Sequence, residues 1–126
     1  MGNASRSGGA GAAVIDVVAG IDKIIASFND QSVDRGTATQ AIVEHLYEAY
    51  PDKNVMVVHS PHLETFNGSV HRHMELPQTV GTIGFEIYVF DDGDFTLLGD
   101  GGFQNWCFKG NYERDGKSRK VKFLKR

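Results

Sequence analysis

The sequence predicts an α+β domain in which two N-terminal helices pack on one face of an antiparallel meander sheet of five or six strands. Three observations lead to this prediction. Over the first 50 residues, apolar side chains recur at three- and four-residue steps, as on one face of a helix. From residue 54 onward, apolar and polar residues tend to alternate. Asp-Gly and Gly-Gly pairs then divide the chain at short intervals, as hairpin turns do.

The length of 126 residues allows one domain of ordinary size. Residues 1–11 consist mainly of Gly, Ala and Ser, and we expect them to be disordered because they offer little apolar surface to bury. We therefore expect residues 12–126 to form a single α+β domain.

The two helices differ in how clearly their ends are marked. The first begins at Ala12, carries its apolar stripe on valine and isoleucine, and ends near Asn29. The second begins at Thr37, which forms a capping box with Gln40. Pro51 ends it, because proline cannot continue a helix.

The strands are predicted from alternation and from turn residues. The segment between residues 60 and 67 is predicted to be a loop, and consecutive strands are expected to be neighbours in one sheet. The expected strands span residues 54–59, 68–76, 85–90, 95–98, 103–112 and 120–124.

Composition limits the class of protein. A hydrophobic content of 40% and a charged content of 23% are typical of soluble globular proteins, and no apolar run is long enough to cross a membrane. No signal-peptide pattern is present. The single cysteine, Cys107, cannot form an internal disulfide. We expect either a cytoplasmic protein or the mature form of a secreted one.

The aromatic residues of the last strands provide the first functional hypothesis. If helices cover only one face of the sheet, the other face carries an exposed aromatic patch, and such patches usually mark interfaces. We therefore predict a non-enzymatic binding domain without a cofactor, which recognises a partner protein, a small apolar ligand or a second copy as a homodimer. The predicted contact residues are Tyr88, Phe90, Trp106, Phe108 and Tyr112.

A histidine cluster provides the alternative hypothesis. Four of the five histidines lie within 15 residues, and His71, His73 and Glu75 share one face of a strand. His59, at the end of the preceding strand, could lie beside them. Imidazole and carboxylate groups are ligands for zinc or non-haem iron, so this set predicts a metal-binding protein or a metal-dependent enzyme. The competing interpretation is a half-exposed strand with polar residues on its wet face.

The charge distribution provides a third hypothesis. Residues 61–115 hold nine acidic and three basic side chains, whereas residues 116–126 hold six basic side chains and no acidic one. A basic terminus can attract nucleic acid or an anionic membrane, so the segment Lys117–Arg126 could make such a contact. The competing interpretation is an edge strand whose lysines prevent pairing with other chains.

Overall fold

A computed structural model of the chain describes residues 9–28, 34–99 and 105–126. The described part is an α+β structure in which two N-terminal helices pack against sheet strands. The elements are α1 (Gly9–Ala26), α2 (Arg35–Ala49), β1 (Asn54–Val58), β2 (His62–Asn67), β3 (Val70–Pro77), β4 (Thr82–Phe90), β5 (Asp92–Leu97), β6 (Trp106–Lys109), β7 (Asn111–Glu113) and β8 (Lys120–Leu124).

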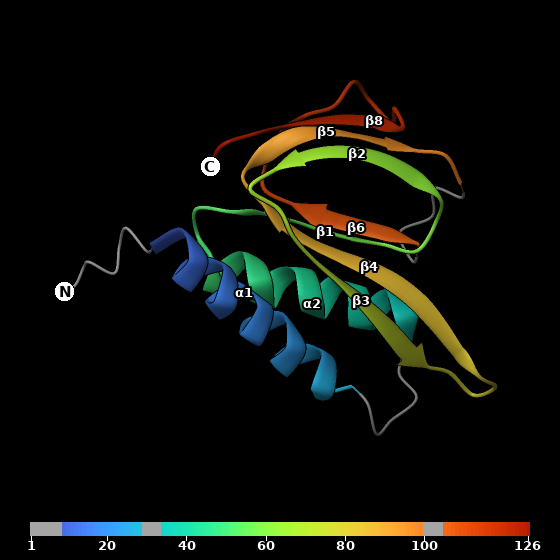
Figure 1. Cartoon of the computed structure of the whole chain (residues 1–126). Coiled ribbons are helices and arrows are strands. Elements are labelled where there is room, and N and C mark those ends of the chain that lie inside the picture. Colours follow the sequence, from blue (N-terminus) through green and yellow to red (C-terminus); the bar gives the residue numbers. More distant parts are fainter. Residues whose placement is uncertain (1–8, 29–33, 100–104) are drawn as a thin grey trace.

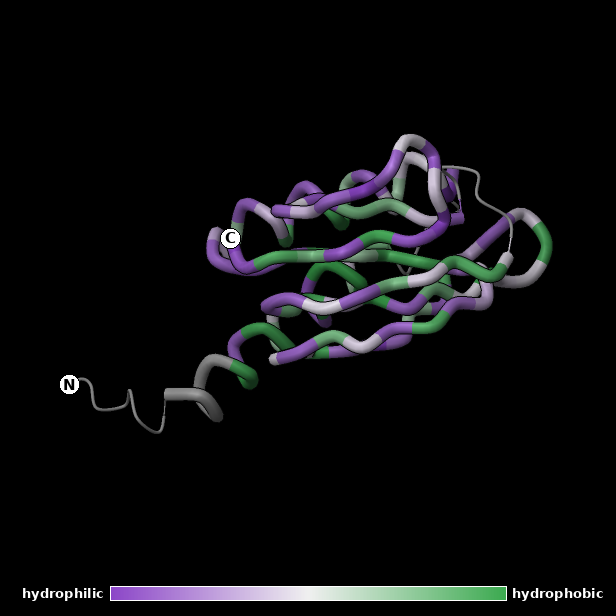
Figure 2. The backbone as a smooth tube through the Cα atoms, turned by 90° about the horizontal axis from the view of Figure 1, so that it is seen from above, coloured by the Kyte–Doolittle hydropathy of each residue, from purple (hydrophilic) through white to green (hydrophobic). Residues whose placement is uncertain are grey.

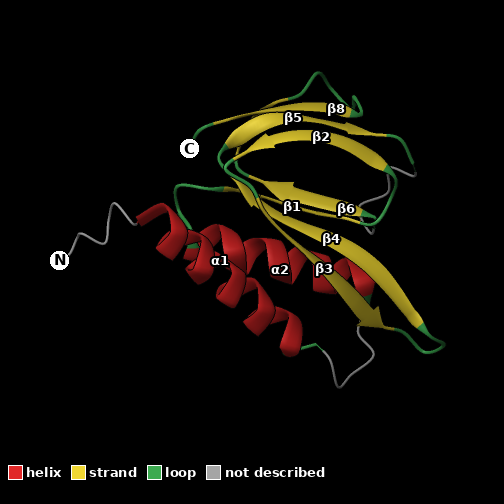
Figure 3. Ribbon diagram, viewed as in Figure 1, coloured by secondary structure: helices red, strands yellow, loops and turns green. Residues whose placement is uncertain are grey.

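The strands form two antiparallel sheets of four strands each, so the prediction of one meander sheet is wrong. The first, which we call the inner sheet, has the order β3-β4-β1-β6 and carries both helices on one face. The second, the outer sheet, has the order β2-β5-β8-β7 and covers the opposite face of the inner sheet. The fold thus has three layers: helices, inner sheet and outer sheet (Figures 1 and 3).

The single-sheet prediction failed because turn residues carry the chain from one sheet to the other. β4 and β5 are consecutive but unpaired, since the chain changes layer at Asp91. The predicted strand 103–112 changes layer at Gly110 and becomes β6 and β7, while its residues 103 and 104 lie outside the described residues. A side chain at Gly110 would meet Asn54 Oδ1, so only glycine fits this bend. The predicted loop 60–67 contains β2, which pairs with β5.

A buried asparagine links the chain segments that pass from one sheet to the other. The side chain of Asn54 is fully buried at the start of β1. Its amide nitrogen donates to the backbone oxygens of Asp91 (2.8 Å) and Leu124 (2.9 Å), and its amide oxygen accepts from the backbone N–H of Asn111 (2.8 Å). One side chain therefore satisfies three backbone groups where the chain leaves regular sheet pairing.

Both helices are present, with ends that differ from the prediction. α1 begins at Gly9, inside the segment expected to be disordered, whereas residues 1–8 lie outside the described residues. α2 begins at Arg35 rather than Thr37, because Asp34 is the N-cap and its carboxylate accepts from the backbone N–H of Thr37 at 3.0 Å. Of the apolar residues expected on the buried stripe of α2, Ala38, Ile42 and Leu46 are buried, whereas Ala41 and Ala49 are exposed.

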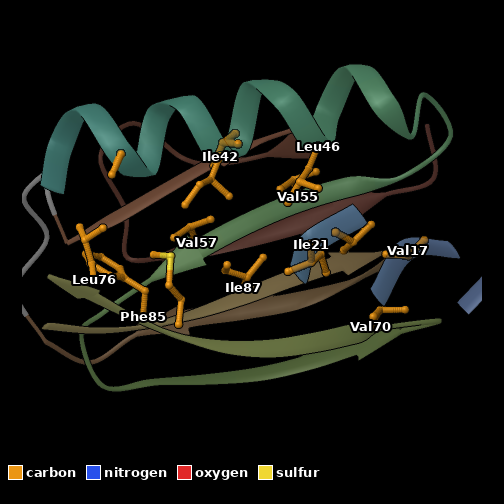
Figure 4. Close-up of a cluster of buried hydrophobic side chains, with 14 residues drawn as sticks. Val17, Ile21, Ile42, Leu46, Val55, Val57, Val70, Leu76, Phe85 and Ile87 are labelled. Carbon is orange, nitrogen blue, oxygen red and sulfur yellow. The ribbon is translucent and has the colours of Figure 1, made fainter. Parts of the chain in front are cut away.

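Two hydrophobic cores lie on the two faces of the inner sheet. Aliphatic residues from both helices, including Ile21, Ile42 and Leu46, pack on Val55, Val57 and Ile87 of the inner sheet (Figure 4). The core between the sheets is built largely of aromatic rings, with Phe90, Phe95, Trp106 and Phe123 among its buried members. Hydrophobic stretches accordingly run along strands of both layers (Figure 2). All five residues of β1 are buried, because it lies between the two cores.

Candidate functional site

The histidine, glutamate and aromatic side chains that could bind a partner or a ligand lie mainly along two open sides of the layer between the two sheets. On one side, β3 of the inner sheet and β2 of the outer sheet are edge strands. On the other side, β6 and β7 are edge strands. The predicted histidine and aromatic residues are divided between these sides and the hydrophobic cores.

Four side chains of β3 and β4 form a connected network, which we call the histidine–glutamate cluster: His71, His73, Glu75 and Glu86. His71 Nε2 lies 2.5 Å from Glu86 Oε1, and His73 Nδ1 lies 2.6 Å from Glu86 Oε2. The other ring nitrogen of His73 bonds to Glu75 Oε2. Thr82 completes the network by donating its hydroxyl to Glu75 Oε1 at 2.7 Å.

The electrostatics of the cluster favour the charged forms of His73, Glu75 and Glu86. Hydrogen bonds to Glu75 and then Glu86 raise the pKa of His73 above its usual 6.5. Hydrogen bonds from Thr82 and His73 lower the pKa of Glu75. Burial acts to raise the pKa of Glu86, but the hydrogen bonds from His73 and His71 outweigh it and lower that pKa below its usual 4.5.

A glycine makes room for this network. Gly84 of β4 lies opposite Glu75 in the sheet register. A side-chain carbon at this position would come within 2.9 Å of both Glu75 Oε2 and the His73 ring. The two side chains therefore fold across the backbone of β4, which a larger residue would prevent.

The other two clustered histidines lie elsewhere. His59 packs its ring against Phe85, a member of the helix-side core, and its Nδ1 lies 2.7 Å from the backbone oxygen of Gly84. It is therefore on the opposite face of the inner sheet from His73. His62 lies on β2 of the outer sheet, with its Nε2 2.8 Å from the Tyr88 hydroxyl.

The metal site predicted from His59, His71, His73 and Glu75 is not assembled. Within residues 9–28, 34–99 and 105–126, no group of three or more His, Cys, Asp or Glu side chains is arranged to hold a metal ion. One residue of the predicted set, His59, lies on the opposite face of the sheet from the other three. It follows the end of β1, where alternation no longer gives the position of a side chain.

The predicted aromatic contact surface is largely buried by the chain's own outer sheet. Tyr88, Phe90 and Trp106 are 5%, 0% and 6% exposed, so these three residues cannot form an open binding face. The Tyr88 hydroxyl has its pKa raised to about 12, by burial first and then by Glu64 and Glu86. The prediction fails here because it assumed a single sheet, and a second sheet covers the face.

Two of the five predicted residues reach the surface at the side formed by β6 and β7. Phe108 is partly buried, and Tyr112 is 44% exposed. Their ring centroids lie 5.0 Å apart, and both rings also contact Phe123 of the core. Arg114 places its guanidinium 4.9 Å from the Trp106 ring centroid and is held by donating to the Ser118 backbone oxygen at 2.7 Å. We call Phe108, Tyr112 and Arg114 the aromatic edge.

A groove of about 340 Å³ adjoins this edge, between α2 and β6. Gln40 and Ala41 of α2 face Cys107 and Phe108 across it, and Lys109 binds Glu44 at 2.7 Å beside it. Burial and the nearby Glu44 raise the pKa of the Cys107 thiol. That direction opposes formation of a reactive thiolate, as expected for a structural cysteine.

The basic C-terminal segment is engaged with the rest of the fold. Lys122 lies opposite Asp94 on one neighbouring strand and opposite Glu113 on the other. Arg126 donates to the backbone oxygens of Tyr47, Tyr50 and Lys53, near the end of α2. β8 is also an interior strand of the outer sheet rather than an edge. Contact of Lys117–Arg126 with nucleic acid or an anionic membrane stays a prediction.

Two residues of these sites escaped the sequence analysis. Glu86 was detectable in principle, because a lone carboxylate within the apolar strand GFEIYVF needs a partner. Arg114 gave no such signal, since its contact with Trp106 depends on the bend at Gly110.

Comparison with known proteins gives one short match. A stretch of 36 residues is 53% identical to part of the stress response protein YvgO of Bacillus subtilis strain 168. The match covers 29% of this chain and 22% of that protein's length, which does not assign the chain to a family. No protein-family model and no solved structure matches the chain. In the part of the chain that the structure describes, no helix is long and apolar enough to span a membrane.

Proposed function

We propose that this chain is a small interaction domain that acts by binding rather than by catalysis, and that it binds a second copy of itself through the aromatic edge. The observation that carries the proposal is the exposure of Tyr112, which is 44% open to solvent although its ring rests on two residues of the core. A ring held in this way loses little side-chain entropy on binding.

The residue types at the edge support recognition of a protein surface. Tyrosine, tryptophan and arginine are the residues in which binding energy most often concentrates at protein interfaces. Tyr112 and Arg114 are two residues apart in the sequence, and Arg114 covers the nearly buried Trp106. Trp106 lies on β6 and Tyr112 on β7, and within the part of the chain that the structure describes both strands are at sheet edges, with no neighbouring strand on this side.

The charges around the rings support a second copy as the partner. A contact related by a two-fold axis uses the same patch on both subunits, so the patch must complement itself. Next to Tyr112 in the sequence, Arg114 stands between Glu113 and Asp115, so both signs of charge are available on each copy. A single-signed patch would repel its own copy, whereas a patch with both signs can pair its charges with those of a second copy.

Sedimentation velocity over a range of protein concentrations up to millimolar tests the proposal. We expect reversible association, weakened about tenfold or more when Tyr112→Ala and Arg114→Ala are combined, as for the loss of an interface hot spot. Leu63→Ala is the matched control, because Leu63 is 61% exposed on β2, away from the edge. A monomer at every concentration, or association that is unchanged in the double variant, would overturn the proposal.

A further inference from the structure

We propose that the hairpin of β3 and β4 contains a proton-dependent clasp, in which the histidine–glutamate cluster fastens the edge strand β3 to β4 in mildly acidic solution and releases it in alkaline solution. The proposal is independent of self-association, because the cluster lies on the other open side of the layer between the sheets.

The hydrogen-bond geometry of His73 requires a charged ring. Both ring nitrogens of His73 face carboxylate oxygens: Nδ1 faces Glu86, and Nε2 faces Glu75. A neutral imidazole has a single N–H, so it can donate only one of these bonds. The other nitrogen would then place its lone pair against a carboxylate oxygen. Loss of one proton therefore breaks one bond and replaces it with repulsion.

The strands are joined through these contacts. Glu86 belongs to β4 and accepts from both histidines of β3, one at each of its oxygens. Glu75 of β3 is held in turn by Thr82 of β4. Side-chain bonds thus link β3 to β4 over much of the hairpin, in addition to the backbone pairing. Among the described residues, no strand lies on the other side of β3, so these bonds affect an edge that can open.

The groups around the His73 imidazole favour its charged form. Glu75 and Glu86 contact it directly, and His71 stacks on the Tyr88 ring with centroids 4.5 Å apart. From β2, His62 bonds to the Tyr88 hydroxyl, and Glu64 acts on the same phenol. Arg72, the basic residue between the two histidines, is bound to Asp22 of α1. The facing acids therefore outnumber the facing cations.

The pH window follows from the direction of each pKa shift. The pKa of His73 is raised above 6.5. The stability that charged His73 gives to the clasp is therefore fully present below pH 6.5 and is lost as pH rises through the raised pKa. The pKa values of Glu75 and Glu86 are lowered below 4.5. The stability that these two carboxylates give to the clasp is therefore present above pH 4.5 and is lost as pH falls through the lowered pKa values. The clasp is therefore strongest between pH 4.5 and 6.5.

Amide hydrogen exchange of the whole chain, followed in chelator-containing buffer across this pH range, tests the clasp. The readout is protection of β3 relative to protection of β1, which removes the intrinsic pH dependence of exchange. We expect relative protection of β3 to fall about threefold to tenfold from mildly acidic to alkaline solution. His73→Gln should flatten this dependence. His45→Gln, which removes an exposed histidine of α2, should leave it unchanged.

A titration of the wild-type histidine rings by NMR tests the same idea without any variant. The expected result is a midpoint for His73 above that of the exposed His45. Equal midpoints for the two rings would overturn the clasp. A pH-independent relative protection of β3 in the wild-type protein, or a dependence that persists in His73→Gln, would overturn it as well.

Discussion

The two cores of this protein share one sheet but close in different ways. On the helix side, aliphatic residues dominate, and two helices cover the sheet (Figure 4). Between the sheets, aromatic rings dominate, and the layer is open along two sides where edge strands end it. The charged and half-exposed residues that could bind a partner or a proton lie at these two sides. The histidine–glutamate cluster is at one side and the aromatic edge is at the other.

The difference follows from the shape of the side chains and the covering elements. Helices offer rows of branched aliphatic groups that fill the grooves of a sheet closely. Two facing sheets leave a space about 10 Å thick, which large rings fill. Rings near the rim of such a layer extend past its edge, as Tyr112 does. The helix-side core therefore serves stability, whereas the aromatic core also supplies the candidate binding surfaces.

The strongest test of this comparison uses two phenylalanines of one strand. Phe85 and Phe90 both lie on β4 and are fully buried, but Phe85 packs in the helix-side core and Phe90 between the sheets. We expect either change to alanine to lower the free energy of unfolding by about 4 kcal/mol, because each removes a buried ring and leaves a cavity. Denaturant unfolding measures both values.

The matched pair makes the outcome decisive. Phe85→Ala is the control for chain position, residue type and burial. A much smaller loss for Phe90→Ala than for Phe85→Ala would mean that the outer sheet is only loosely attached to the inner one, and the comparison between two cores would fail.

The sequence predicted the elements better than their arrangement, for a physical reason. Periodicity is a local property, so the alternation of β3 and the buried positions Ala38, Ile42 and Leu46 of α2 were read correctly. Glycine and aspartate turns at Gly68, Asp91 and Gly110 use the same residues whether the chain returns to its own sheet or passes to another. Pairing of β2 with β5 is decided by long-range packing, which turn residues do not encode.

The sites show the same limit. His71, His73 and Glu75 share a face, as alternation predicts, and Glu86 was missed because it comes from the neighbouring strand. The aromatic residues were assigned correctly to apolar strands, but Trp106 and Phe90 lie under the outer sheet rather than in solvent. Exposure depends on which layer covers a face, and that information resides in the tertiary fold.

A second test concerns the hydrogen bonds that the Asn54 side chain makes at the corner of the two sheets. Asn54→Ala removes an amide that serves three backbone groups at the corner of the two sheets. We expect a loss of about 3 kcal/mol in the free energy of unfolding, because three partly buried backbone groups are left without partners. Asn67→Ala is the control: its exposed amide makes a single side-chain bond, to Asp92 at 2.6 Å, and its loss should be about 0.5 kcal/mol. Equal losses for the two variants would contradict the role of Asn54 as the link between the layers.

The smallest expected effect lies at the aromatic edge, where the comparison can be sharpened by spectroscopy. Arg114→Ala should lower the free energy of unfolding by only about 0.5–1 kcal/mol, since a cation beside a ring at the surface contributes little.

Trp106 is the only tryptophan of the chain and is 6% exposed beneath Arg114, so its fluorescence reports this position alone. Removing the guanidinium admits water to the ring, and the emission maximum should shift to longer wavelength. Arg72→Ala removes the same charge from the helix-facing side of β3, where Arg72 binds Asp22 of α1, and should leave the emission unchanged. An identical spectrum for Arg114→Ala and wild type would show that Arg114 does not shield the indole, and the edge would then lack one of the three residues on which its recognition role depends.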